Sequence, residues 1–138
     1  GYYYGFVVAF LVYFLYIYVL TLVWNLGWKF DFNLMILPSI GMLMMIMGVL
    51  LSKAKRNFFI GIRTPWTLSS DEVWNRTHRL GGMLFKAAGV IIILLIFVPK
   101  IAIYVLLGLI FGMVIWLVIY SYILYRKLGQ TPKPPAGQ

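Results

Sequence analysis

The chain has 138 residues, of which 63% are hydrophobic and only 11% are charged, with a formal net charge of +9 and no cysteine. Soluble domains are about 25% charged, and one of this size has too little interior to bury so much apolar surface. The lack of cysteine excludes disulfides, thiolate catalysis and cysteine metal sites. The composition therefore predicts an integral membrane protein. The basic residues flank apolar runs, which indicates membrane topology and not nucleic-acid binding.

Four apolar segments are each long enough to cross a bilayer. They cover approximately residues 2–26, 34–52, 80–98 and 101–125. Continuous runs of this length predict helices, because the strands of a membrane barrel would alternate over about ten residues. We therefore expect an all-α, polytopic membrane protein with a four-helix transmembrane domain over residues 1–128. A proline-rich tail over residues 129–138 is expected to be extended, and the start of the chain does not resemble a cleaved signal peptide.

The basic residues are distributed unevenly about these spans. Ten lie between the second and third spans, at the start of the third span or in the tail: Lys53, Lys55, Arg56, Arg63, Arg76, Arg79, Lys86, Arg126, Lys127 and Lys133. The other two, Lys29 and Lys100, lie at the opposite side. The positive-inside rule therefore predicts a multi-pass protein of the cell membrane whose N- and C-termini are both cytoplasmic. Lys86 can extend back to the membrane interface.

Glycines in two of the spans are spaced for helix packing. Gly108 and Gly112 form a small-xxx-small pair on the fourth span, and Gly41 and Gly48 lie a heptad apart on the second. Small residues let two helix backbones approach closely in a membrane. We predict a close intramolecular contact at Gly108 and Gly112, with Gly41 and Gly48 able to do the same.

A polar segment over residues 57–79 interrupts the apolar sequence. Ser69 precedes Glu72 by three residues, which is the spacing of a helix capping box, so a helix is expected to begin near Ser70. Glu72 and Arg76 are four residues apart and are expected to pair on that helix. A structured loop and helix should therefore join the second and third spans on the cytoplasmic side.

The expected helix presents one face at helical spacing. This face carries Trp74, Thr77, His78, Gly81, Gly82 and Phe85. Trp74 and Trp66 are expected at the level of the lipid headgroups. The adjacent glycines allow a close approach or mark a kink.

The residues before this helix predict a defined backbone path. Pro65 restricts Thr64 to an extended conformation, and Gly61 is suited to a turn that a residue with a Cβ would not adopt. Arg63 carries a planar guanidinium that fits a carboxylate or a phosphate. We expect it to bind one of the two nearby acidic side chains, a helix C-terminus or a lipid phosphate.

The same segment offers little for catalysis. His78 with Asp71 and Glu72 is a weak ligand set, because a metal site normally has three or more well-spaced ligands. Ser69 and Ser70 are explained as caps, which leaves no nucleophile for a triad. No acidic residue lies within a span, so a proton relay is not indicated. The sequence predicts no catalytic residue, metal or cofactor, no enzymatic activity, and a structural hydrogen bond for His78.

Three stretches of the polar segment, residues 57–68, 72–74 and 77–79, form a recognisable motif that includes Asn57, Gly61, Arg63, Thr64, Pro65, Trp66, Thr67, Glu72, Trp74, Thr77, His78 and Arg79. This motif resembles the signature of the SdpI family of membrane proteins. Its namesake members are bacterial immunity proteins against a secreted killing peptide, and they also take part in signalling by holding a repressor at the membrane. The resemblance implies a non-enzymatic binding protein that acts through these residues.

Three functions are compatible with the sequence. The first is an immunity or sensor protein whose cytoplasmic motif engages a peptide toxin or a protein partner. The second is a small accessory or structural subunit of a larger membrane complex. The third, a transporter or membrane enzyme, lacks a second polar cluster within the spans. Membrane lipids are expected partners in each case, and nucleic acids in none.

Overall fold

The computed structural model describes residues 1–129, and every regular element in that part of the chain is a helix. The elements are α1 (Tyr2–Asn25), α2 (Phe32–Lys53), α3 (Pro65–Ser69), α4 (Asp71–Leu94), the 3-10 turn η1 (Leu95–Phe97) and α5 (Pro99–Gly129). Gly129, the first residue of the expected proline-rich tail, closes α5. The rest of that expected tail lies outside the described residues.

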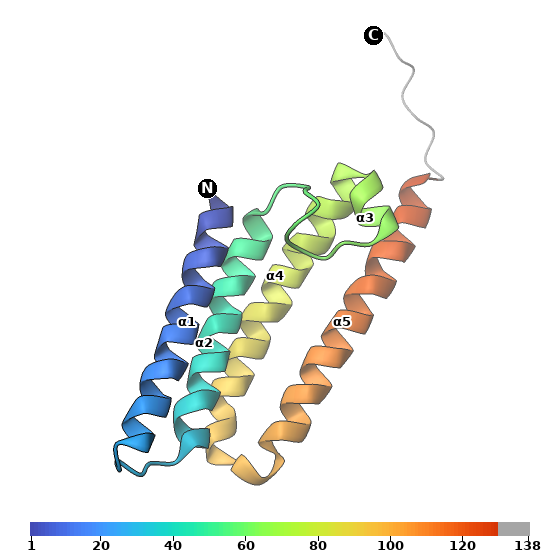
Figure 1. Ribbon diagram of the computed structural model, residues 1–138. Coiled ribbons are helices and arrows are strands. Elements are labelled where there is room, and N and C mark those ends of the chain that lie inside the picture. Colours follow the sequence, from blue (N-terminus) through green and yellow to red (C-terminus); the bar gives the residue numbers. More distant parts are fainter. Residues whose placement is uncertain (130–138) are drawn as a thin grey trace.

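The four long helices stand side by side and alternate in direction (Figure 1). Each is long and apolar enough to cross a membrane; the shortest, α2, has 22 residues, or about 33 Å at about 1.5 Å per residue. This confirms the all-α, four-span prediction. The N-terminus, the end of α5 and the segment that joins α2 to α4 lie at the same end of the bundle (Figure 1), which we call the motif end.

Glycines hold α2 and α4 together at the centre of the bundle. A Cβ atom added to Gly41 would lie 2.5 Å from the carbonyl oxygen of Gly89, and one added to Gly82 would lie 2.6 Å from that of Gly48. The two helix backbones therefore touch at two levels, seven residues apart on each helix. Such close packing is the main attraction between helices in lipid, where the hydrophobic effect is weak. The prediction for Gly41 and Gly48 is confirmed.

The prediction for Gly108 and Gly112 is wrong within this chain. Nothing lies within 4 Å of a Cβ atom added to either glycine. Both line an apolar groove of about 320 Å³ between α4 and α5. The glycines of α4, Gly82 and Gly89, contact α2 instead, so the pair on α5 has no glycine opposite it.

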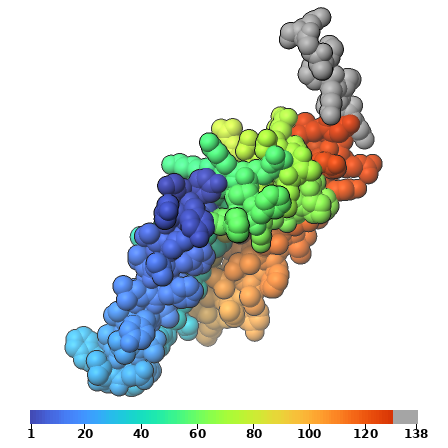
Figure 2. Space-filling model, turned by 45° about the horizontal axis from the view of Figure 1, so that its top comes forward, coloured from blue at the N-terminus to red at the C-terminus, as the bar shows by residue number. Residues whose placement is uncertain are grey.

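The two outer helices, α1 and α5, make less extensive contacts than α2 and α4 make with each other. Near η1, Ala102 of α5 packs with Leu37 and Ile92, whereas further along α5 Met113 and Leu117 pack with Ala88 of α4. In contrast, α1 packs along α2 and lies along one edge of the molecule (Figure 2). The helices thus form an open row in the order α1, α2, α4, α5 (Figure 1).

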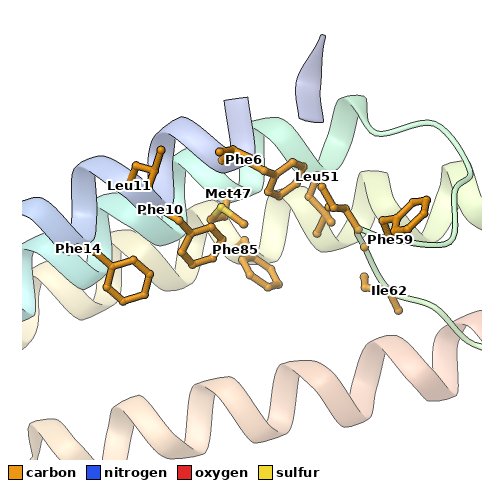
Figure 3. A pocket seen from close by; sticks show the side chains of 12 residues that line it. Phe6, Phe10, Leu11, Phe14, Met47, Leu51, Phe59, Ile62 and Phe85 are labelled. Atoms are coloured by element: carbon orange, nitrogen blue, oxygen red, sulfur yellow. The ribbon is translucent and has the colours of Figure 1, made fainter. Parts of the chain in front are cut away.

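This open arrangement leaves an apolar groove of about 580 Å³ near the motif end. Aromatic side chains of α1 line one side, and Met47, Leu51 and Phe85 of the central helices line the floor (Figure 3). Phe59 and Ile62, from the segment between α2 and α4, close its end (Figure 3). The groove therefore lies where the membrane-spanning helices meet the polar segment.

Candidate functional site

The polar segment folds back over the first turns of α4 (Figure 1), beginning with a turn that Asn57 organises. Its side-chain oxygen accepts hydrogen bonds from the backbone N–H groups of Phe59 and Ile60, at 2.8 and 2.7 Å. Its side-chain amide donates to the carbonyl of Lys55 at 2.8 Å. Asparagine favours such turns because its short side chain replaces a backbone hydrogen-bonding group. Asn57 therefore directs the chain from α2 back towards α4.

Gly61 brings the segment against α4. Its φ angle is +117°, a conformation that residues with a Cβ rarely adopt. A Cβ atom here would also collide with Nε2 of His78 and approach the ring of Trp74 to 3.1 Å. The turn predicted at Gly61 is confirmed, and glycine is required both for the conformation and for the space.

His78 connects the segment to α4 through both ring nitrogens. It is only 1% exposed. Nε2 accepts the backbone N–H of Ile62 at 2.9 Å, so Nδ1 carries the proton and donates it to the carbonyl of Trp74 at 2.8 Å. The imidazole is therefore neutral in this arrangement. A protonated ring carries a proton on both nitrogens and could not accept the N–H of Ile62. The structural hydrogen bond predicted for His78 is confirmed.

Trp74 lies beneath this histidine and is completely buried. The two rings stack with centroids 3.9 Å apart and an interplanar angle of 16°. Nε1 of Trp74 donates to the carbonyl of Ala54, immediately after α2, at 2.8 Å. The ring is covered by residues of the segment that follows α2 and is not exposed to lipid headgroups. Trp74 instead joins the end of α2 to α4.

Thr64 and Thr67 form the capping box of a short helix, α3. The backbone N–H of Thr64 donates to Oγ1 of Thr67 at 2.8 Å, and that of Thr67 donates to Oγ1 of Thr64 at 3.2 Å. Thr64 is extended, as predicted, with φ −114° and ψ 160°, and Pro65 occupies the first helical position. Both threonines are buried. Loss of such a cap costs about 0.5–2 kcal/mol, so these side chains stabilise the loop.

The capping box predicted at Ser69 is wrong. Ser69 is the last residue of α3, and its hydroxyl donates to the carbonyl of Trp66 at 3.1 Å. Ser70 is the N-cap of α4, with Oγ accepting from the backbone N–H of Val73 at 3.3 Å. Because Ser69 belongs to α3, the N-cap of α4 is Ser70 and not Ser69. The helix start expected near Ser70 is confirmed.

Trp66 fixes α3 to α5. Its Nε1 donates to Oγ of Ser121, and its ring packs edge-on against Tyr122 with centroids 5.2 Å apart. Ser121 is completely buried. The indole of Trp66 thus hydrogen-bonds to α5 within the bundle. The prediction for Trp66 considered only a position among the lipid headgroups and did not include this bond.

The ion pairs differ in part from those predicted. Glu72 pairs with Arg76, as expected from their spacing. Asp71 pairs with Arg56 at 3.0 Å, and Arg56 also donates to the carbonyl of Leu68 at 2.9 Å. The expected pairing of Arg63 with an acidic side chain is wrong, because Arg56 and Arg76 occupy both acids. Arg63 is exposed and donates to the carbonyl of Phe58.

The predicted site residues thus fall into two groups. Most are engaged with one another inside the segment, and Thr77 is buried with no hydrogen-bond partner for its hydroxyl among the described residues. Arg63, Pro65, Glu72 and Arg79 face outward. In residues 1–129, no group of three or more acidic or histidine side chains is placed to hold a metal. The segment is therefore a compact structural unit with a basic outer surface.

Sequence reasoning missed two partners of this unit, Arg56 and Ser121. Arg56 stands among other basic residues just after α2, and nothing local to it signals a bond to α3 and α4. Ser121 lies inside an apolar span, 55 residues from Trp66. A lone serine in a membrane helix is the signal that was available, because such side chains often bond between helices.

Comparison with known proteins agrees with the signature. The family model of the SdpI/YfhL protein family matches residues 53–123, which include the whole polar segment. The immunity protein SdpI of Bacillus subtilis (strain 168) is 32% identical over 104 residues, which are 75% of this chain and 50% of that protein. The chain thus spans about half the length of this curated relative. No solved structure matches it. The match of the family model to more than half of the chain shows that this membrane protein belongs to the SdpI family.

Proposed function

We propose that the chain is an immunity protein that protects a membrane against a peptide toxin, and that it does so through residues 57–79. The observation that carries this proposal is the position of Arg63. The family signature folds around it into a hydrogen-bonded unit, yet Arg63 itself is exposed and, within residues 1–129, pairs with no carboxylate. A guanidinium held in a fixed place outside a rigid unit is suited to bind a partner's carboxylate or backbone carbonyl.

The neighbouring surface supports a binding role and not an enzymatic one. Phe58 and Phe59 are 73% and 82% exposed and lie just before the Gly61 turn. Aromatic and arginine side chains together are typical of protein-binding surfaces. Among the buried polar side chains of the segment, His78 and Trp74 bond to backbone groups and Thr64 bonds to Thr67, so these side chains have a structural role.

The arrangement at the motif end supports a cytoplasmic location for this surface. The N-terminus, the end of α5 and the polar segment share that end (Figure 1), together with most of the basic residues. Since positive residues are retained on the cytoplasmic side, we propose that both ends of the described bundle and the motif face the cytoplasm. A toxin that has inserted into the membrane, or a protein that responds to it, would then be met from inside.

Replacement of Arg63 by alanine is expected to abolish protection while the protein stays folded. Cells that express the chain are challenged with the killing peptide against which family members confer immunity, and survival is compared with expression level. Loss of one charge-assisted hydrogen bond lowers the affinity for a partner by about tenfold or more. Stability should change by less than about 1 kcal/mol, because Arg63 is exposed.

Arg76→Ala is the matched control, because Arg76 is also an exposed arginine of the same unit and pairs with Glu72. It should protect cells as the unaltered chain does. Full survival with Arg63→Ala, or equal loss with both variants, would contradict a specific role for Arg63. No protection by the unaltered chain would contradict the immunity function itself.

A further inference from the structure

Lys86 is a charged residue inside a membrane-spanning helix. It lies 15 residues after the start of α4, within the span Asp71–Phe97. Its stem packs on α2, where a Cβ atom added to Gly48 would meet Cγ of Lys86 at 2.9 Å. Gly48 precedes Lys53, the last residue of α2, by five residues, or about 7.5 Å along the helix. The stem of Lys86 therefore begins inside the apolar part of the bundle, near its motif end. An uncompensated charge is unfavourable there.

The direction of the helix brings Lys86 towards a second cation. Side chains on a helix lean towards its N-terminus, and the N-terminus of α4 is at the motif end (Figure 1). Arg79 lies two turns earlier on the same face of α4, and both residues are exposed. The side chain of Lys86 is therefore expected to lean along α4 towards the end of the helix where Arg79 lies.

No acidic side chain of the chain is available to either cation. The chain has three acidic residues. Asp71 pairs with Arg56 and Glu72 pairs with Arg76. Asp31 caps the start of α2 at the opposite end of the bundle, where it accepts the backbone N–H of Asn33 at 2.9 Å. The acidic side chains thus leave Arg79 and Lys86 available to an anion of another molecule.

The surface beyond the two cations is apolar. Met83, Val90 and Leu94 are exposed on the same face of α4, because they follow Arg79 at intervals of four, seven and four residues. The face thus carries positive charge near the motif end and a hydrocarbon surface along the rest of its length. A phospholipid has the complementary order, with a phosphate at the interface and acyl chains below it, whereas a soluble anion would use only the first part.

We propose that this face of α4 is a binding site for an anionic phospholipid. The guanidinium of Arg79 and the ammonium of Lys86 bind the phosphate, and an acyl chain lies along Met83 and Val90. Gly48 contributes by leaving room on α2 for the stem of Lys86. Arginine and lysine near a bilayer surface attract acidic lipids in this way, and here the geometry fixes two of them on one helix face.

The test titrates the purified full chain in detergent with phosphatidylglycerol or phosphatidylcholine and counts bound lipids by native mass spectrometry. Phosphatidylglycerol should bind preferentially, and Lys86→Met and Arg79→Gln should each weaken that binding about fivefold. Lys127→Gln, which removes an exposed cation on α5 at the same end, should have no effect. Methionine keeps the length of the lysine stem, and Arg79→Gln alters an exposed side chain, so at least one variant is expected to stay folded.

Equal binding of the two lipids, or unchanged phosphatidylglycerol binding in a folded Lys86→Met or Arg79→Gln variant, would overturn the proposal. Inorganic phosphate provides a further arm. If millimolar phosphate displaced the lipid completely, the site would be one for soluble anions and the proposed lipid site would be wrong. Toxin survival is measured separately, so this result and that of Arg63→Ala remain independent.

Discussion

Replacing Gly82 by valine is expected to separate α2 from α4 and to lower the thermal stability of the purified protein sharply. The first added carbon alone would lie 2.6 Å from the carbonyl oxygen of Gly48 and 2.8 Å from Cβ of Ser52. A backbone carbonyl cannot rotate away as a side chain can, so the helices must move apart. Overpacking costs about 1–3 kcal/mol, and we expect the upper part of that range because the main attraction between the helices is their close contact. Loss of helical circular dichroism on heating in detergent measures the effect.

Gly108→Val is the matched control. It adds the same side chain to another glycine of a membrane-spanning helix, where nothing lies within 4 Å of the new Cβ. Its unfolding temperature should stay close to that of the unaltered chain. Equal destabilisation by the two variants would show that valine itself, and not the α2–α4 contact, is responsible.

The second large effect is expected from His78→Ala, which should release the polar segment from α4. The substitution removes the acceptor for the N–H of Ile62 and the ring that stacks on Trp74. A buried donor without a partner costs about 1–3 kcal/mol, and truncation of a buried aromatic ring costs about 3–5 kcal/mol. We therefore expect a loss of at least about 3 kcal/mol. Trypsin should then cleave after Arg63 much faster than in the unaltered chain.

Asn75→Ala serves as the control for this experiment, because Asn75 is an exposed residue on the first turns of the same helix. Its cleavage rate should match that of the unaltered chain. His78→Gln retains a side-chain hydrogen-bond acceptor and is expected to restore part of the protection from trypsin. If His78→Ala left the cleavage rate unchanged, the segment would not depend on His78 for its attachment.

The helices of this protein could be predicted from sequence because long apolar runs in lipid have few alternatives to helical structure. The glycine contacts could be predicted only in part. Gly41 and Gly108 both occur in suitable spacings, but which pair is used depends on the face that α4 presents, and that face is set by Gly82 and Gly89. A spacing on one helix does not specify its partner.

The candidate site shows the same division between local and distant determinants. The turn at Gly61 and the extended Thr64 follow from local backbone preferences. The five-residue helix α3 was missed because it is too short to show a helical period, although Thr64, Pro65 and Thr67 carry its capping signal. The bonds of Trp66 to Ser121 and of Trp74 to Ala54 join residues 55 and 20 positions apart, and no local pattern encodes them.

The central claim is that a neutral His78 attaches the part of the polar segment that precedes α4 to that helix. Nitrogen NMR of the chain labelled with ¹⁵N at histidine and isoleucine tests it most directly. The account predicts a proton on Nδ1 of His78 and a scalar coupling across the hydrogen bond between Nε2 and the backbone nitrogen of Ile62. A proton on Nε2, or rapid exchange between the two tautomers without that coupling, would contradict it.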